Sequence, residues 1–151
     1  MTGPMTTDCD HFLDLLVERQ WGELRASGLR FTGARAGEGG AAGYTEHASV
    51  SVLDSRFDHG SAYQGSGWMT TGAPSATVRG NRFCGGSGES GLYVGTLDGG
   101  ESTVSSNLFQ DHTDPSWCAL TLGDYGSIDI LHNTFVGNEG SLGSVCGGRA
   151  S

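Results

Sequence analysis

Lysine is absent from this sequence, and positive charge is scarce: 8 basic residues, all arginine, stand against 17 acidic ones in a chain of 151. The formal net charge of −9 repels phosphate groups, so we expect no nucleic-acid partner. No apolar run approaches the about 20 residues that cross a bilayer, so we expect no membrane span. Residues 1–7 are neither basic nor apolar, and we expect no secretory signal peptide there.

Cysteine is rare and shows no paired spacing. Cys9, Cys84, Cys118 and Cys146 are too far apart in sequence for a usual metal site, and we expect neither a metal nor a cofactor. Cys118 lies two residues before Leu120, so strand alternation puts the two side chains on the same face. Cys146 follows Leu120 by 26 residues (146 − 120 = 26), one interval of the repeat described below. Both are therefore predicted to point inward as buried free thiols. A disulfide between them is the alternative.

Glycine, by contrast, is abundant, with 27 residues, which favours many short strands and tight bends over helices. The chain also repeats itself. Such a repeat indicates that one side chain stacks on its copy in the next coil. Five of the six phenylalanines recur at a constant interval of 26: Phe31, Phe57, Phe83, Phe109 and Phe135.

Two further columns accompany the phenylalanines. We expect an apolar column, five residues before Phe, to fill the core with the aromatic rings. A polar column, two residues before Phe, is predicted to form a ladder of amide hydrogen bonds at a corner, with Asn itself in the left-handed conformation. The columns are Val52, Val78, Val104 and Ile130, and then Ser55, Asn81, Asn107 and Asn133.

The segments Val78–Phe83, Val104–Phe109 and Ile130–Asn138 resemble right-handed parallel β-helix repeats of the pectate-lyase-like superfamily. That superfamily includes pectate lyases, polygalacturonases, alginate epimerases, phage tailspikes and bacterial surface proteins. The resemblance covers residues 46–146, with a weaker copy at 22–45. It implies an all-β solenoid of four to five coils and an extracellular or cell-surface location. It does not specify function, because members of such a fold differ in their loops.

The two ends of the predicted solenoid differ. Residues 1–21 are predicted to contain an amphipathic helix that caps the first coil, because Phe12, Leu13, Leu16 and Val17 follow helical spacing. Residues 22–151 then form the parallel β-helix. No such device follows Phe135. We expect the C-terminal coil either to be covered by another chain, including a second copy, or to continue into a longer polypeptide.

Outward side chains are the candidates for binding. An exposed aromatic pair, Tyr93 and Trp117, suits stacking on the rings of a polysaccharide or surface glycan. Cover by neighbouring loops is the alternative. The assignment follows from strand alternation, with Leu92, Val94, Cys118 and Leu120 facing inward and Ala119 and Thr121 outward.

A second outward column consists of Arg30, Arg56 and Arg82, each directly before a phenylalanine. Like charges on strands about 5 Å apart repel, so the column requires acceptors or an anionic ligand. Asp58 is predicted to bridge Arg56 to Arg82. Arg56 and Arg82 are candidate ligands for an acidic polysaccharide, and a solvated, partly salt-bridged ladder is the alternative.

Asp58 and His59, with Asp111 and His112 two coils later, are weak catalytic candidates. Equivalent positions two coils apart are separated by about 10 Å, which can span a bound sugar. The residues show no aspartate cluster of the polygalacturonase kind, no calcium-binding set of the pectate lyase kind and no Asp-Pro-His-Asp order of the alginate epimerase kind. Loops of this composition are ordinarily solvated bends.

Three classes of function remain. We favour a noncatalytic β-helix segment of a secreted or surface protein, with a structural or glycan-binding role. The second class is a fragment of a polysaccharide lyase, hydrolase or epimerase. The third, ranked last, is an ice-binding solenoid, which requires a flat outward threonine array, whereas the threonines are scattered, such as Thr70, Thr96 and Thr121.

Overall fold

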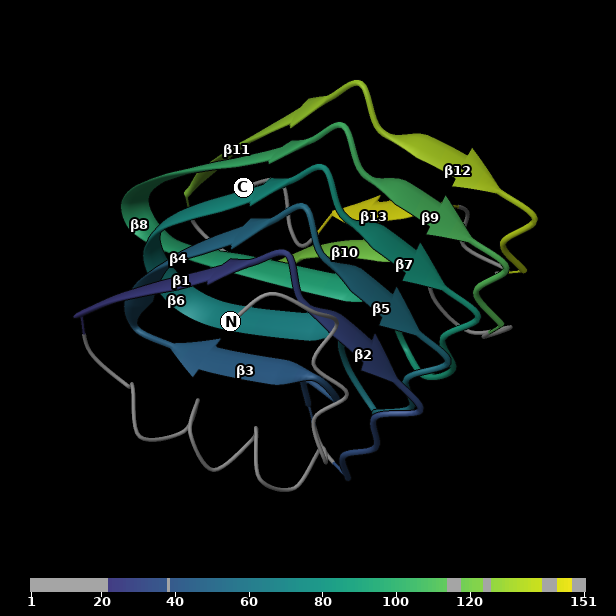
Figure 1. Cartoon of the computed structure of the whole chain (residues 1–151). Coiled ribbons are helices and arrows are strands. Elements are labelled where there is room, and N and C mark those ends of the chain that lie inside the picture. Colours follow the sequence, from purple (N-terminus) through teal and green to yellow (C-terminus); the bar gives the residue numbers. More distant parts are fainter. Residues whose placement is uncertain (1–21, 38, 114–117, 124–125, 140–143, 148–151) are drawn as a thin grey trace.

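The computed structural model describes residues 22–37, 39–113, 118–123, 126–139 and 144–147. Within these ranges every regular element is a β-strand, and there is no helix (Figure 1). The strands stack in parallel, copy upon copy, at the expected spacing of about 26 residues. The chain is therefore a parallel β-solenoid of about four turns. The predicted capping helix and the segment 1–21 lie outside the described residues.

One sheet carries the phenylalanine column. It consists of five strands of three residues each: β2 (Arg30–Thr32), β5 (Arg56–Asp58), β7 (Arg82–Cys84), β9 (Leu108–Gln110) and β12 (Thr134–Val136). Their order is β12-β9-β7-β5-β2, and every phenylalanine pairs in register with the next. The ring centroids lie 4.9–5.4 Å apart with interplanar angles of 6–10°. The predicted aromatic stack is confirmed.

The second sheet contains the remaining eight strands. Strands β6 and β8 are long enough to pair with two shorter strands each, β6 with β3 and β4, and β8 with β10 and β11. Its strands are β1 (Gly22–Ser27), β3 (Gly43–Glu46), β4 (Ala48–Leu53), β6 (Trp68–Arg79), β8 (Leu92–Ser105), β10 (Leu120–Gly123), β11 (Ser127–Leu131) and β13 (Val145–Gly147). Val52, Val78 and Val104 are fully buried on its inner face, as the repeat predicts.

The predicted asparagine ladder is also present. The Nδ2 group of Asn107 donates to the Val78 carbonyl and to Oδ1 of Asn133, both at 2.9 Å. Its Oδ1 accepts from the backbone N of Asn81 at 2.9 Å and from Nδ2 of Asn81 at 3.0 Å. Asn81 and Asn107 are buried, and each rung satisfies the polar groups of its neighbours, as buried amides require.

The left-handed corner residue is not Asn, so that prediction was wrong. The residue one place earlier has positive φ, which leaves the Asn side chain free to point into the coil. A second left-handed column lies two residues after each phenylalanine. The two columns are Gly28, Asp54, Gly80, Ser106 and His132, and Gly33, His59, Gly85, Asp111 and Gly137.

The interval of 26 does not hold for the second apolar run of each coil. Leu92 pairs with Trp68 (92 − 68 = 24), and Leu120 pairs with Leu92 (120 − 92 = 28). Loops of different length lie between each phenylalanine and this run, and they absorb the difference. Cys146 consequently aligns with Thr121 rather than with Leu120, contrary to the prediction. Ala119, predicted to face outward, is 2% exposed and belongs to the core.

Candidate functional site

Arg30, Arg56 and Arg82, here called the Arg row, lie on the outer face of the phenylalanine sheet. The three residues are Cα partners on neighbouring strands β2, β5 and β7. The phenylalanine that follows each arginine points into the core, so strand alternation directs the arginine outward. The side chains of Arg30 and Arg56 are 49% and 42% exposed. The predicted outward column is thus in place.

Asp58 holds the first two members of the Arg row. Its Oδ2 atom accepts a hydrogen bond from Nε of Arg56 and lies 3.8 Å from Nε of Arg30. The Asp58 side chain is 5% exposed, so this is a largely desolvated carboxylate. The ion pairs of Asp58 are with Arg56 and with Arg30 of the preceding coil, whereas the predicted bridge was from Arg56 to Arg82. Arg82 has another hydrogen-bond partner, on its own strand, which raises the pKa of Arg82 most, and the charge of Asp58 adds to that rise.

That partner is Cys84, the free thiol of strand β7. Nε of Arg82 donates to Sγ of Cys84 at 2.7 Å, and a terminal nitrogen of Arg82 donates to Oε1 of Gln110 at 3.2 Å. The hydrogen bond to Cys84 and the charge of its thiolate form raise the pKa of Arg82. Gln110 in turn donates to Asp111 at 3.0 Å. Cys84 and Gln110 were not foreseen, although both follow a phenylalanine directly, as Asp58 does.

The Nε contacts fix each guanidinium group at its inner edge. The terminal nitrogens of Arg30 and Arg56 make no hydrogen bond to any residue that the structure describes. A guanidinium group held in this way presents its outer nitrogens to a planar anion such as a carboxylate or a sulfate. The Arg row therefore has the chemistry of an anion-binding surface.

The four catalytic candidates do not converge. Asp58 faces outward against the arginines, whereas His112 is buried with Nε2 at 3.1 Å from the Gly88 carbonyl. His59 and Asp111 occupy a left-handed corner column, two coils apart. Their side chains take the space that a Cβ would need on Gly85 and Gly137 of the following coil. The structure therefore does not bring the four candidates together in one site.

A small cavity lies beside His112 inside the coil. Its volume is about 10 Å³, and Phe57, Phe83, Phe109 and Ser66 are among its lining residues. This is room for about one water molecule. The cavity is too small for a sugar ring, and of the four candidates only His112 lines it.

The predicted aromatic platform is described only in part, because Trp117 lies outside the described residues. Tyr93 is half-buried, and its ring fills the space beside Gly95 and Gly123. The threonines named for an ice-binding array, Thr70, Thr96 and Thr121, are 0%, 0% and 6% exposed. They cannot form an outward array.

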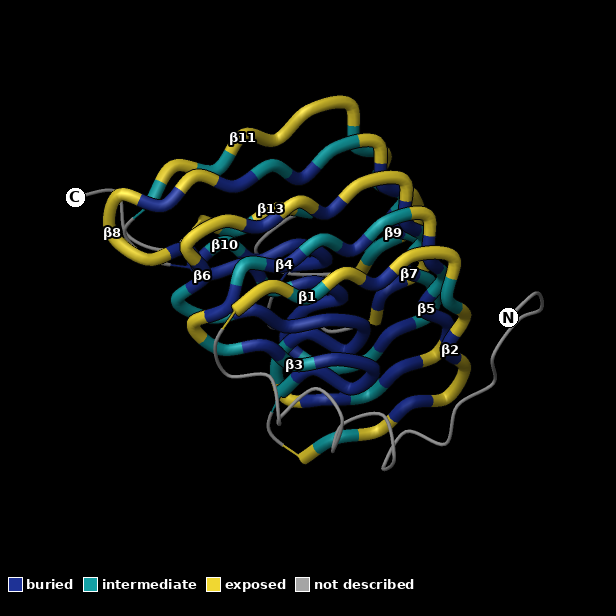
Figure 2. The backbone as a smooth tube through the Cα atoms, turned by 60° about the vertical axis from the view of Figure 1, so that its left-hand side comes forward, coloured by how far each residue is buried: buried dark blue, intermediate teal, exposed yellow. Residues whose placement is uncertain are grey.

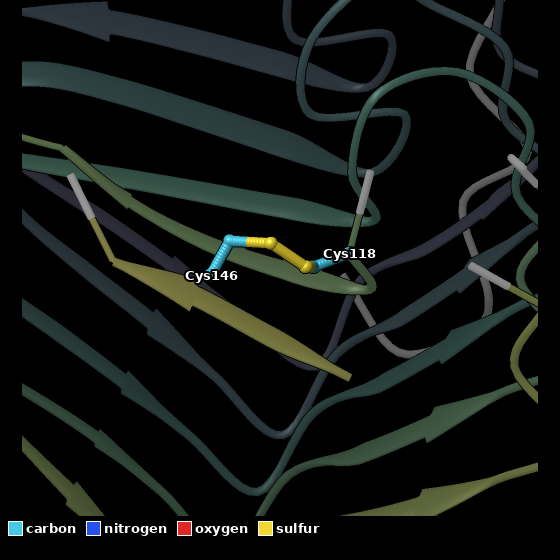
Figure 3. Close-up of a disulfide and its surroundings, with 2 residues drawn as sticks. All are labelled: Cys118 and Cys146. Atoms are coloured by element: carbon cyan, nitrogen blue, oxygen red, sulfur yellow. A yellow bond between two sulfur atoms is a disulfide. The ribbon is translucent and has the colours of Figure 1, made fainter. Parts of the chain in front are cut away.

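Cys118 and Cys146 form a disulfide, with Cα atoms 5.7 Å apart (Figure 3). The prediction of two free thiols was wrong for these residues. Strand β13 stacks on β10 and so brings Cys146 to the start of the β10 coil. Cys118 itself is buried, as expected.

Comparisons with protein-family models, with curated proteins and with solved structures find no match. The assignment to a parallel β-solenoid therefore depends on the strand geometry, and membership of the pectate-lyase-like superfamily stays a prediction. Within the described ranges, no group of three or more His, Cys, Asp or Glu side chains is arranged to hold a metal ion. The same ranges contain no helix with the length and apolar character to span a membrane.

Proposed function

We propose that this chain is a noncatalytic solenoid segment of a secreted or cell-surface protein, and that it binds an acidic polysaccharide along the Arg row. The observation that carries the proposal is the arrangement of three guanidinium groups in register on one sheet face. Their Nε atoms contact Asp58 and Cys84, while the terminal nitrogens of Arg30 and Arg56 make no hydrogen bond to the described part of the chain.

The geometry of the face suits an extended chain rather than a single small anion. Neighbouring strands are about 4.8 Å apart, so the arginines repeat along the solenoid axis at that interval. A polymer that carries a carboxylate or sulfate on each sugar can contact several arginines at once. Such multiple contacts raise the overall affinity although each one alone is weak.

The charge of the surroundings limits the expected affinity. The Arg row with Asp58 carries a local charge of +2 (3 − 1), whereas the whole chain carries −9. The Arg row therefore attracts an acidic polymer only at short range, against the repulsion from the negative charge of the whole chain. Salt screens the attraction. We expect modest binding that weakens steeply with ionic strength.

The absence of catalysis is supported by the positions of the candidate residues. Asp58 is held by arginines, His112 faces the interior and His59 and Asp111 belong to corner columns. An extracellular location is supported by the Cys118–Cys146 disulfide, because such bonds persist mainly in oxidising compartments.

The test is affinity electrophoresis and calorimetry with polygalacturonate and alginate, using dextran as the neutral polymer. We expect binding to both acidic polymers and none to dextran. Arg56→Gln and Arg82→Gln should each weaken binding roughly three- to tenfold, as loss of a partly exposed charge-assisted contact implies. Arg79→Gln is the matched control, because Arg79 is exposed on strand β6 of the other sheet.

Four results would contradict the proposal. The first is equal binding of dextran, and the second is an Arg56→Gln variant that binds as the parent does. The third is a loss of binding in Tyr93→Ala alone, which would move the site to the aromatic side of the solenoid. Release of unsaturated or shortened sugars during incubation would show that the chain is an enzyme.

A further inference from the structure

The last described coil leaves its core open, whereas the first does not. Ile130 is 38% exposed, although Val104, its partner one coil earlier, is 0% exposed. Strands β11 and β12 pair on one side only, with β8 and β9, and Figure 2 shows the exposed trace along β11. Ala26 and Phe31 of the first coil also pair with a described strand on one side only, yet they are 6% and 2% exposed. The open edge of the solenoid is therefore its C-terminal coil.

Exposed apolar side chains gather at this open end. Six large apolar side chains of the described ranges are exposed, and four of them lie on the terminal strands β11, β12 and β13: Ile130, Leu131, Val136 and Val145. Val145 continues the column of Leu120, which is fully buried one coil earlier. Exposed core residues and backbone groups without a strand partner both favour a further layer at this end.

A second copy of the chain can supply that layer only with its own C-terminal coil, because its first coil is covered. Two identical surfaces meet across a two-fold axis, so that residue i of one copy contacts residue j of the other and j contacts i. Strand β11 runs toward the corner at His132 and Asn133, and β12 runs away from it. An axis through this corner therefore sets β11 of each copy antiparallel to β12 of the other.

This register matches inner faces with inner faces. Residues at equal distances from the corner lie opposite each other, which places Ile130 opposite Phe135 and Asp129 opposite Val136 of the second copy. Ile130 and Phe135 both end core columns, so each covers the open side of the other. Asp129 and Val136 are each adjacent to one of them in sequence, so strand alternation directs both outward. The antiparallel ladder also pairs the open backbone groups of both strands.

The distribution of charge permits this arrangement. Asp129 is the only charged residue in the described strands β11 and β12, and the two-fold axis places it opposite Val136 rather than opposite its own copy. The net charge of −9 on each chain still opposes association, and salt screens that repulsion. Association driven by apolar contact and strand edges should therefore strengthen with salt.

We infer that the C-terminal coil is a dimer interface, in which β11 pairs with β12 of a second copy of this chain. The interface is the cross-section of one coil, so the dimer forms only at high protein concentration. Because the first described coil is covered, the assembly stops at the dimer.

The first test is sedimentation velocity on the full chain over a wide range of concentration, at low and at high salt. We expect a monomer and a dimer in a ratio that depends on concentration, with no larger species. The fraction of dimer should rise with added salt.

The second test changes the residue that the register places opposite Asp129. Val136 is 49% exposed and faces outward, so its substitution should leave the fold intact, as circular dichroism checks. Val136→Arg gives Asp129 an opposite charge and Val136→Glu gives it a like charge, so the first variant should dimerise roughly tenfold more tightly than the second. Leu97→Arg and Leu97→Glu are the matched controls, because Leu97 is 37% exposed in strand β8 and the change in net charge is the same. These two should differ far less.

Several results would overturn the inference. They are a chain that stays monomeric at every concentration, an assembly that grows beyond the dimer, and two Val136 variants of equal affinity. A difference as large between the two Leu97 variants would also count against it, since only net charge would then matter. The assay contains no polysaccharide, so its outcome is independent of the glycan-binding proposal.

Discussion

The first and last described coils present the same ladder positions to different surroundings. Ala26 and Phe31 of the first coil are 6% and 2% exposed, whereas Ile130 of the last is 38% exposed and Phe135 is half-buried. In a solenoid each side chain packs against its copies on both sides, so a terminal position without cover loses about half of its contacts. The same residue type in the same column should therefore contribute differently to stability along the axis.

The phenylalanine column gives the largest expected effect. Phe109 is fully buried between Phe83 and Phe135, and Phe109→Ala should lower the free energy of unfolding by about 3–5 kcal/mol. Phe135→Ala removes a half-buried ring with one stacking partner and should cost roughly half as much. Urea denaturation followed by circular dichroism measures both. Equal losses would show that the C-terminal coil is covered in solution.

The disulfide should produce the next largest effect, because it ties the C-terminal side of the solenoid where the core is open. Cys118 and Cys146 are separated by 28 residues in sequence. Closure of a loop of that length stabilises the folded chain by about 3–4 kcal/mol. Cys146→Ser should therefore lower stability by that amount, and reduction of the parent with dithiothreitol should do the same. Cys84→Ser is the control, since Cys84 is a free thiol, and a large loss there would contradict the assignment.

The asparagine ladder offers a smaller contrast. Asn107→Ala removes bonds to Val78, Asn81 and Asn133 and leaves buried backbone groups unpaired, at a cost of about 2–3 kcal/mol. Asn133→Ala, at the partly exposed end of the ladder, should cost about 1 kcal/mol, because water replaces part of what is lost. Chemical denaturation of both variants measures the difference. A larger loss for Asn133 would reverse the proposed order of the two positions.

Much of the fold could be predicted because stacked columns leave a strict interval in the sequence. Phe31 to Phe135 and Asn81 to Asn133 keep that interval, since each side chain must meet its own copy. The second apolar run of each coil does not keep the interval, because loops of variable length precede it. The predicted positions of Cys146 and Ala119 were wrong for this reason. The left-handed corners were misassigned because glycine, Asp, Ser and His alternate there instead of one recurring residue.

The candidate site was harder to predict because its contacts depend on side-chain direction. The outward position of the Arg row follows from alternation alone. The pairing of Asp58 with the preceding coil and of Arg82 with Cys84 depends on conformations that no interval in the sequence encodes. His59 and Asp111 were catalytic candidates because they are ionisable residues at the start of loops. Both have positive φ and belong to the left-handed corner column, so the backbone turn accounts for their positions.

The exposed charges of the first and last described coils should have the smallest effect on stability. The Arg25–Glu23 ion pair spans 3.4 Å between side chains that are 76% and 67% exposed, so solvent screens it strongly. Arg25→Gln and Asp129→Asn should each change the free energy of unfolding by less than about 0.5 kcal/mol, as measured by urea denaturation at low protein concentration. A large loss of stability in either variant would mean that the charge supports its own coil.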